Sequence, residues 1–282
     1  MIPPIADKFL AGETDLEAFQ HVKDVNSENI NVILNHLGEH YHEREPAVRD
    51  TITYVEILYC IDQLDVDACI SFKPSQIGIT VNEELFRDNL DTIFENNFGQ
   101  FVWMDMEDHT TTQTTIDAYK AHETDNIGMC LQANLKRTQE DLHDLADHPG
   151  KIRLVKGAYD EPSSIAYKDK ERIDRNYREC MEIMFEEFDQ GVAIGSHDLE
   201  MIDHAEELSE EYDQDYEIQM LMGVRPEKQR ELAHNHELWQ YCPYGKKWKS
   251  YFYRRVRENT DNLKFAAKAA IEAIQSDLHF KN

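Results

Sequence analysis

Short apolar runs rich in β-branched residues recur along the chain, separated by polar stretches long enough to form a helix. The apolar runs predict eight strands, at 31–36, 68–74, 101–106, 127–132, 152–156, 191–196, 216–222 and 237–242. Their near-continuous apolar character, rather than clean alternation, is typical of parallel strands covered on both faces. The polar stretches predict crossover helices at 47–64, 82–96, 111–122, 138–148, 162–189 and 198–211.

Eight strand–helix units within 282 residues are what a (β/α)8 barrel requires. A doubly wound open sheet is the alternative, but no GxGxxG motif follows the first predicted strand. No Pro/Gly-rich linker or change of composition divides the chain. We therefore expect an α/β fold in which residues 1–282 form a single TIM-like barrel domain, with extra helices near 15–24 and 261–276.

Charge restricts the partners of the chain. It has 29 Lys and Arg against 56 Asp and Glu, a formal net charge of −27. Such a surface repels nucleic acid and anionic lipid, so neither is an expected partner through a broad electrostatic footprint. The acidic residues are scattered, which favours a halophilic protein kept soluble in concentrated salt. An acidic face that binds a basic partner is the alternative.

Five cysteines form no CxxC pair, which predicts buried free thiols in a reducing compartment. No signal-peptide pattern opens the chain, and no apolar run approaches the roughly 20 residues needed to span a bilayer. We therefore expect a cytoplasmic protein.

Polar side chains are concentrated where the predicted strands end. These positions are Asn35, His36, Lys73, Asp105, Glu107, Gln132, Lys156, Ser196, His197 and Tyr241. In a (β/α)8 barrel, active sites lie at the carboxyl ends of the strands. Because a purely structural barrel needs few polar groups there, the pattern predicts an active site at this rim.

The run IRLVKGAY (152–159) is the most informative of these segments. Arg153 and Lys156 stand within an apolar strand, where an unpaired charge is costly and must meet a counter-charge or a ligand. A buried ion pair between strands is an equally good interpretation of Arg153. Gly157 and Ala158 remove side-chain bulk, which lets a flat ligand approach the backbone.

A second constellation lies in 241–259, where a helix is expected to begin around Lys246. Glu258 lies three and four positions beyond Arg255 and Arg254 and is spaced to orient their guanidinium groups. Adjacent arginines held in this way suit bidentate capture of a carboxylate. The alternative is a solvated helix face with salt links.

The segment DMEDH (105–109) supports a different hypothesis, a metal-assisted barrel hydrolase using Asp105, Glu107 and His197. Against it, Asp105 and Glu107 share one face of an extended segment while Asp108 points away. Histidines that could converge on them from other strand ends are few.

Taken in order, the motifs resemble the proline dehydrogenase family over essentially the whole chain. The matching segments are FLAGET (9–14), NHLGE (35–39), ISFKPSQIG (70–78), DMED (105–108), LQANLKRT (131–138), RLVKGAYDE (153–161), IGSHD (194–198), IQMLMG (218–223), YCPYG (241–245) and YRRVREN (253–259). The resemblance implies a distorted (β/α)8 barrel that binds flavin adenine dinucleotide (FAD) non-covalently. It also implies oxidation of L-proline to Δ1-pyrroline-5-carboxylate, with electrons passing to a quinone or another acceptor. Peripheral contact with the inner face of the membrane is an open alternative to a wholly cytoplasmic location.

The resemblance also implies roles for individual residues. Asn35 and Arg153 would be catalytic. The substrate would contact Arg254, Arg255, Tyr241, Tyr159 and Leu221. The cofactor would contact His36, Gln132, Arg153, Val155, Lys156, Gly157, Ser196, His197 and Glu258. No metal is implied.

Two positions depart from the usual family pattern. Asn35 stands where the D-x-L-G-E motif usually has Asp, so it cannot balance the charge of the arginines. Ser196 stands where Thr is commoner and keeps the hydroxyl. Asn35 is the one feature that favours a third hypothesis, a barrel that binds proline or flavin without catalysis.

Overall fold

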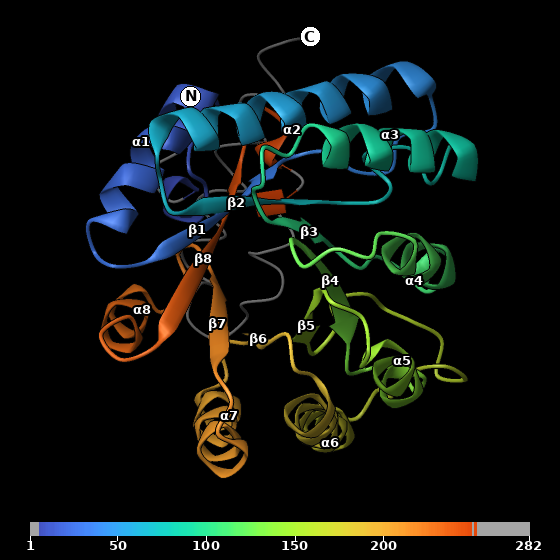
Figure 1. Cartoon of the computed structure of the whole chain (residues 1–282), viewed down its shortest axis with the longest axis vertical. Coiled ribbons are helices and arrows are strands. Elements are labelled where there is room, and N and C mark those ends of the chain that lie inside the picture. The colour runs from blue at the N-terminus through green and yellow to red at the C-terminus, as the bar shows by residue number, and fades with distance from the viewer. Residues whose placement is uncertain (1–5, 250, 253–282) are drawn as a thin grey trace, which may run out of the picture.

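A computed structural model describes residues 6–249, 251 and 252 (Figure 1). Eight parallel strands form a closed barrel in chain order, and the last strand pairs with the first. The strands are β1 (Asn31–His36), β2 (Ala68–Phe72), β3 (Val102–Met104), β4 (Ile127–Gln132), β5 (Lys151–Val155), β6 (Val192–Gly195), β7 (Tyr216–Leu221) and β8 (Glu237–Tyr244). The predicted barrel is confirmed, and every predicted strand end lies within two residues of the observed one.

Helices surround the barrel, as Figure 1 shows. They are α1 (Asp15–Asn26), α2 (Arg44–Leu64), α3 (Glu83–Glu95), α4 (Thr112–Lys120), α5 (Thr138–Leu145), α6 (Lys170–Glu187), α7 (Leu199–Tyr212) and α8 (Pro226–Leu232). A short 3-10 helix, η1 (Asp7–Phe9), precedes α1. The predicted helix near 15–24 is α1, which begins with a capping box in which the side chains of Thr14 and Glu17 satisfy free backbone N–H groups.

Two helix predictions need correction. The helix expected over 162–189 begins only at Lys170, because Asp169 caps it there by accepting from the backbone of Arg172 at 3.1 Å. The preceding residues 156–169 form an irregular loop that contains Pro162. The seven-residue α8 was not predicted, because its sequence is polar and too short for a helical apolar pattern. The helix expected near 261–276 lies outside the described residues.

The strands separate two apolar layers. The larger lies between the strands and the helices and includes Tyr54, Phe86 and Tyr177. A smaller cluster inside the barrel contains Ile33, Cys69, Trp103 and Ala193, with Phe101, Trp239 and Tyr241 packed against it. Because side chains alternate along a strand, the residues two positions beyond this cluster also point inward. Those positions meet at the carboxyl ends of the strands.

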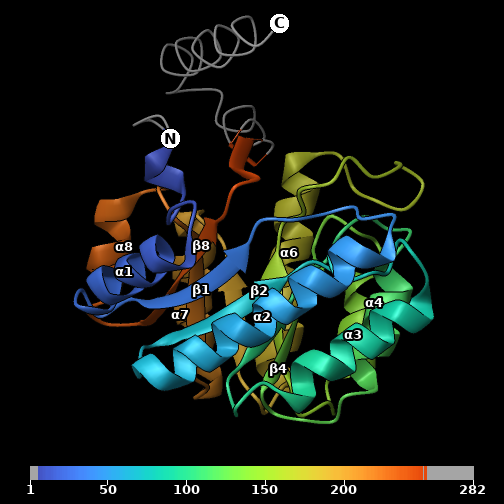
Figure 2. The same cartoon turned by 90° about the horizontal axis from the view of Figure 1, so that it is seen from above.

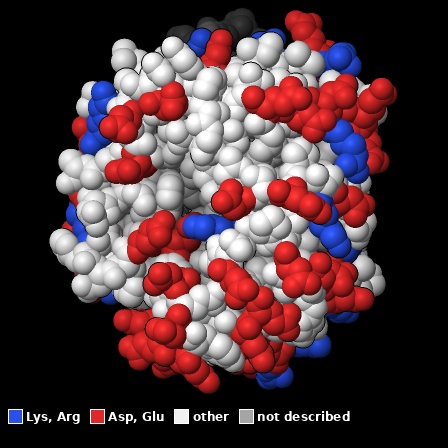
Figure 3. Space-filling view, viewed as in Figure 1, with Lys and Arg blue, Asp and Glu red and all other residues white. Residues whose placement is uncertain are grey.

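All five cysteines are free, four of them buried and Cys60 partly buried, in accordance with the sequence. Within the described ranges, no helix is both long enough and apolar enough to cross a bilayer. Asp and Glu are spread over much of the face in Figure 3, with fewer Lys and Arg among them.

Candidate active site

Polar side chains from most of the strands meet at the carboxyl end of the barrel. In Figure 2, the segment that follows β8 lies at the end of the barrel toward which β8 runs. Tyr251 and Phe252 of that segment are buried with Phe9, Leu10 and Leu37, so the chain folds back over η1 and the loop after β1. The segment after β8 therefore packs beside the carboxyl end of β1.

Arg153 and Asp105 form a buried ion pair inside the barrel. Arg153 lies in β5 and Asp105 directly follows β3, and the side chains are 5% and 13% exposed. Nη2 of Arg153 donates to Oδ1 of Asp105. The guanidinium carbon also lies 5.0 Å from the ring centre of Trp103 and 5.7 Å from that of Tyr241. The interpretation of Arg153 as half of a buried ion pair is therefore correct, and the pair lies at the predicted rim.

Two hydroxyl groups complete the environment of the Asp105 carboxylate. Ser71 of β2 donates to Oδ1 at 2.7 Å, and Tyr241 of β8 donates to Oδ2 at 2.6 Å. Burial alone would raise the pKa of Asp105, but the charges of Arg153 and Lys73 and the two hydroxyl donors outweigh burial and hold this pKa below its ordinary value. Asp105 is therefore an ionised group that fixes side chains from three strands.

Asn35 lies beside this cluster and is almost fully buried. Its Nδ2 donates to the backbone carbonyl of Ser71 at 2.8 Å, while its Oδ1 has no hydrogen-bond partner in the described part of the chain. A buried acceptor without a partner is uncommon and is expected to meet a ligand or water. Asn35 therefore offers one acceptor atom at the mouth of the barrel.

The ends of β4 to β7 bring together most of the residues that the sequence predicts as a cofactor site. Gln132 donates to the backbone carbonyl of Glu107 at 2.8 Å. The Oγ of Ser196 accepts from the backbone of Asp198 at 3.1 Å, and Nε2 of His197 accepts from the backbone of Leu221 at 3.3 Å. These side chains are held by backbone groups at or just beyond the ends of β3, β6 and β7, which orients them along one arc of the rim.

Lys156 is held by two carboxylates at the outer part of that arc. Its Nζ donates to Asp198, the N-cap of α7, at 2.6 Å, and also to Asp174 of α6. These contacts connect the end of β5 to the start of two helices. The positive charge of Lys156 is therefore balanced within the protein.

The loop after β5 begins at a glycine that packs against Asn134. Gly157 has a φ of +108°, and a Cβ built there would lie 2.2 Å from Oδ1 of Asn134. That Oδ1 is buried without a hydrogen-bond partner among the described residues. Only glycine fits this position without displacing either the loop or the Asn134 amide.

His36 does not join this group. Its ring packs against Tyr244 and Tyr54, with centroid distances of 5.4 and 6.3 Å, and its Nδ1 lies 3.9 Å from Asp50 of α2. This is the layer between the strands and the helices rather than the interior of the barrel. Arg254, Arg255 and Glu258 lie outside the described residues. Tyr159, Val155 and Leu221 are partly buried at the ends of β5 and β7.

The metal hypothesis receives no support from the geometry. Asp105 is committed to Arg153, and Glu107 accepts from both the backbone and the hydroxyl of Ser75, at 2.6 and 2.7 Å. In residues 6–249, 251 and 252, no group of three or more His, Cys, Asp or Glu residues is arranged to hold a metal ion. The carboxylates of this segment instead organise the loops after β2 and β3.

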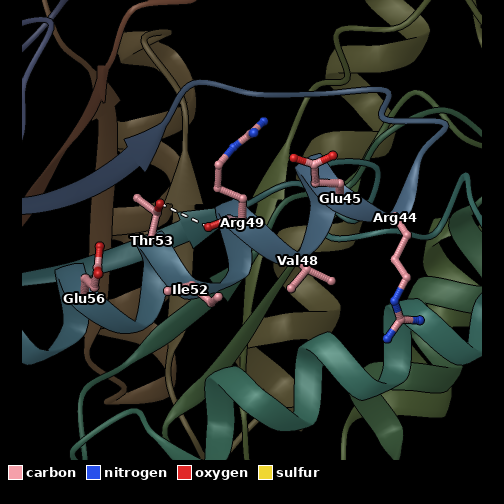
Figure 4. Close-up of a pocket in the computed structure, with 7 residues that line it drawn as sticks. All are labelled: Arg44, Glu45, Val48, Arg49, Ile52, Thr53 and Glu56. Atoms are coloured by element: carbon pink, nitrogen blue, oxygen red, sulfur yellow. Dashed lines mark hydrogen bonds between the residues drawn. The ribbon is translucent and has the colours of Figure 1, made fainter.

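The surface of the described residues contains a hollow near the strand ends and another on α2. One, of about 390 Å³, adjoins the strand ends and is lined by Leu37, Gly38, Glu39, Lys73, Lys246, Lys247 and Lys249. The other, of about 580 Å³, is lined by residues of α2 alone, and Figure 4 shows side chains such as Val48 and Ile52 projecting from that helix. Because Ile52 is half exposed, the second hollow is an open helix surface, whereas the first is a basic recess at the barrel mouth.

Sequence reasoning missed Ser71 and Gln219 as members of the site and gave Asp105 a role only in the metal hypothesis. Gln219 in β7 accepts from Nη1 of Arg153 at 3.0 Å. Both missed residues are polar positions inside apolar strands, which is the signal that could have found them. Ser71 contacts Asp105, and Gln219 contacts Arg153. Neither pairing could be inferred without knowing which residues face each other across the barrel.

Comparison with known proteins agrees with this geometry. The family model described as proline dehydrogenase matches residues 18–268. Proline dehydrogenase 2 of Bacillus subtilis is 31% identical over 273 residues, covering 93% of this chain and 89% of the relative. Proline dehydrogenase of Deinococcus radiodurans is 30% identical over 283 residues, covering 95% of this chain and 90% of the relative.

Solved structures share the fold at lower sequence identity. Proline utilization A from Bdellovibrio bacteriovorus, inactivated by N-propargylglycine, superposes with a TM-score of 0.85 at 21% identity over 92% of this chain. The protein of that name from Corynebacterium freiburgense superposes with a TM-score of 0.77 at 22% identity over 90% of this chain. This chain spans about a third of the length of each, 33% and 31% respectively.

Proposed function

The chain belongs to the proline dehydrogenase family, and on that premise we propose that its barrel mouth oxidises L-proline to Δ1-pyrroline-5-carboxylate with FAD as cofactor. Proline oxidation follows from the family, which makes the chain an oxidoreductase of proline catabolism. The observation that carries the proposal for the site is the Arg153–Asp105 pair, a guanidinium buried at the strand ends and held by a carboxylate of lowered pKa. A fixed cation of this kind suits a cofactor that gains negative charge.

The residues present fit a flavin. Asn35 Oδ1 is a buried acceptor without a partner in the described residues, and flavin rings carry polar edges. Gly157 lets the loop after β5 turn at a positive φ against Asn134, and the flat ring of the cofactor would lie against Val155 and the backbone of Gly157. Gln132, Ser196 and His197 supply polar groups along the same arc. When bound, FAD would accept the hydride removed from proline and pass the electrons to a quinone.

The protein side chains bind and orient the substrate in this proposal. Arg254 and Arg255 would grip the proline carboxylate, and the basic hollow beside Lys73 would favour the approach of that carboxylate. Tyr241, Tyr159 and Leu221 would form walls around the ring. The hydroxyl of Tyr241 donates a hydrogen bond to Asp105, which fixes the orientation of the Tyr241 ring. Catalysis of this kind depends on position rather than on acid–base chemistry.

We place the enzyme in the cytoplasm, with peripheral contact at the inner face of the membrane where a quinone would accept electrons. What supports such a contact is the hollow at the barrel mouth, which four lysines line in an otherwise acidic protein.

An absorbance spectrum tests the proposed function most directly. We expect protein purified in concentrated salt, or reconstituted with FAD, to have the absorption bands of an oxidised flavin, and L-proline added without oxygen to bleach them. D-proline serves as the matched control. Bands that persist after L-proline would favour a non-catalytic flavin-binding barrel, with Asn35 the first residue to examine. Protein that takes up no FAD would contradict the proposal.

Arg255→Met separates substrate binding from cofactor binding. Removing one charge-assisted contact to the carboxylate is expected to raise the KM for proline about ten- to a hundredfold, with FAD still bound. Steady-state kinetics and the flavin spectrum measure the two effects. Arg87→Met, which removes an exposed arginine paired with Glu83 on α3, is the matched control and should change neither. Loss of FAD from Arg255→Met would be inconsistent with the assigned role.

A further inference from the structure

We propose that Gln219 is a positioning residue that holds the Arg153 guanidinium in its working orientation, and that Glu217 sets the direction of the Gln219 amide. The inference deepens the proposed function, because the role of Arg153 rests on it. Neither Gln219 nor Glu217 is one of the proposed substrate or cofactor contacts. Both lie on β7, inside the barrel.

The contacts form a continuous chain. Oε1 of Gln219 accepts from Nη1 of Arg153 at 3.0 Å, and Nε2 of Gln219 donates to Oε1 of Glu217 at 2.6 Å. Gln219 and Glu217 are 4% and 3% exposed, so water does not compete for these hydrogen bonds. A buried amide with both ends bonded is held in one position.

The neighbours of the amide decide which way it points. A guanidinium can only donate hydrogen bonds, and an ionised carboxylate can only accept them. The carbonyl of Gln219 must therefore face Arg153, and its NH2 group must face Glu217. Because both neighbours require the same orientation, the amide cannot rotate by half a turn without losing both bonds.

Glu217 is itself held by Lys151, which lies at the amino end of β5. Nζ of Lys151 lies 2.8 Å from Oε2 of Glu217 and 5.6 Å from the centre of the Phe101 ring. Burial raises the pKa of Glu217, and the charge of Lys151 opposes that shift. Lys151 thus supplies the counter-charge that Glu217 needs in order to direct the amide of Gln219.

Gln219 restricts a motion that Asp105 alone permits. Asp105 binds Nη2 and Gln219 binds Nη1, so the two acceptors fix both outer nitrogens of the guanidinium. The rings of Trp103 and Tyr241 limit movement out of the plane. Without Gln219, Nη1 loses this acceptor, and we expect the guanidinium to pivot about its remaining contacts with Asp105 and the Cys130 side chain, so that its other N–H groups change direction.

The test is the variant Gln219→Leu, which keeps most of the side-chain volume and removes the acceptor. Crystal structures of the variant and the wild type should show the Arg153 guanidinium displaced. In the holoenzyme, we expect kcat to fall about ten- to a hundredfold while the KM for proline stays within about twofold. The midpoint potential of the bound flavin should become more negative, because the cation no longer faces the cofactor.

Gln240→Leu is the matched control. Gln240 is also buried, lies on the neighbouring strand β8, and bonds His21 and Gln229 at 2.8 and 2.7 Å rather than Arg153. The Gln240→Leu variant should leave the position of Arg153, kcat and the flavin potential unchanged, even if the substitution lowers stability. Gln219→Glu should restore most of the rate, because it keeps an acceptor for Arg153 and shares a proton with Glu217.

Each outcome decides a separate point. An unmoved guanidinium in Gln219→Leu overturns the proposal whatever the reaction is. A displaced guanidinium with unchanged kcat and potential overturns the link to catalysis, as would a Glu variant as slow as the Leu variant. Wild-type protein whose flavin proline does not reduce overturns the proposed function instead, and the structures still decide whether Gln219 positions Arg153.

Discussion

Replacing Asp105 with alanine is expected to lower the free energy of unfolding by about 3–5 kcal/mol and to lower kcat by about a hundredfold or more. The variant leaves the Arg153 guanidinium buried without a counter-charge and frees the hydroxyls of Ser71 and Tyr241 from their acceptor. Denaturant titration measures the stability, and steady-state kinetics with proline measure kcat. The combined loss reflects a single carboxylate that supports both the fold and the site.

Two controls separate the buried charge from lesser effects. Ser71→Ala removes one hydrogen bond to Asp105 and keeps both charges, so it should cost about 1 kcal/mol. Glu83→Ala breaks an exposed ion pair with Arg87 and should change stability by less than about 1 kcal/mol. If Asp105→Ala were no more destabilising than Glu83→Ala, Arg153 would have to find another buried partner, and Asp105 would not be the group that holds the site together.

The barrel was predictable because its strands are buried on both faces. Most strands are apolar runs such as NVILNH or IGMCLQ, and their near-continuous apolar character separates them from the polar helices around them. The prediction failed where local signals compete. The stretch 162–169 is polar enough for a surface helix. It instead forms a loop, and the helix α6 begins only after Asp169, which caps it.

The site was predictable in location but not in pairing. Strand ends place Asn35, Gln132, Arg153 and Tyr241 at one rim whatever the details of the fold. The sequence also requires that Arg153 meet a counter-charge. It cannot say that the counter-charge is Asp105, because β3 and β5 are not neighbours and the contact depends on the tilt of strands around a closed barrel.

His36 illustrates the same limit at the scale of one residue. It is adjacent in sequence to Asn35, but successive side chains of a strand point to opposite faces. Asn35 therefore faces Ser71 at the barrel mouth, while His36 faces Tyr54 and Tyr244 in the outer layer. Motif position alone assigns both residues to the rim, and only the direction of each side chain distinguishes them.

The second large effect is expected from Gly157→Ala. The positive φ of +108° costs a non-glycine residue about 1–3 kcal/mol. The new Cβ would also lie 2.2 Å from Oδ1 and 2.4 Å from Cγ of Asn134, so either the loop or the amide must move. Because the loop continues directly from β5, its displacement should raise the Kd for FAD about a hundredfold or more, which corresponds to about 2.7 kcal/mol. Fluorescence titration of the apoprotein with FAD measures this Kd.

Gly99→Ala separates backbone strain from the clash. Gly99 also has a positive φ, of +79°, but a Cβ there would have no heavy atom within 4 Å. The Gly99→Ala variant should therefore lose stability through backbone strain alone and bind FAD as the wild type does. The double variant Gly157→Ala/Asn134→Ala removes the obstructing amide, whose Oδ1 forms no hydrogen bond within the described residues, and should recover most of the FAD affinity. If the double variant bound FAD as weakly as Gly157→Ala, the loss of affinity would come from the backbone conformation at residue 157 and not from the contact with Asn134.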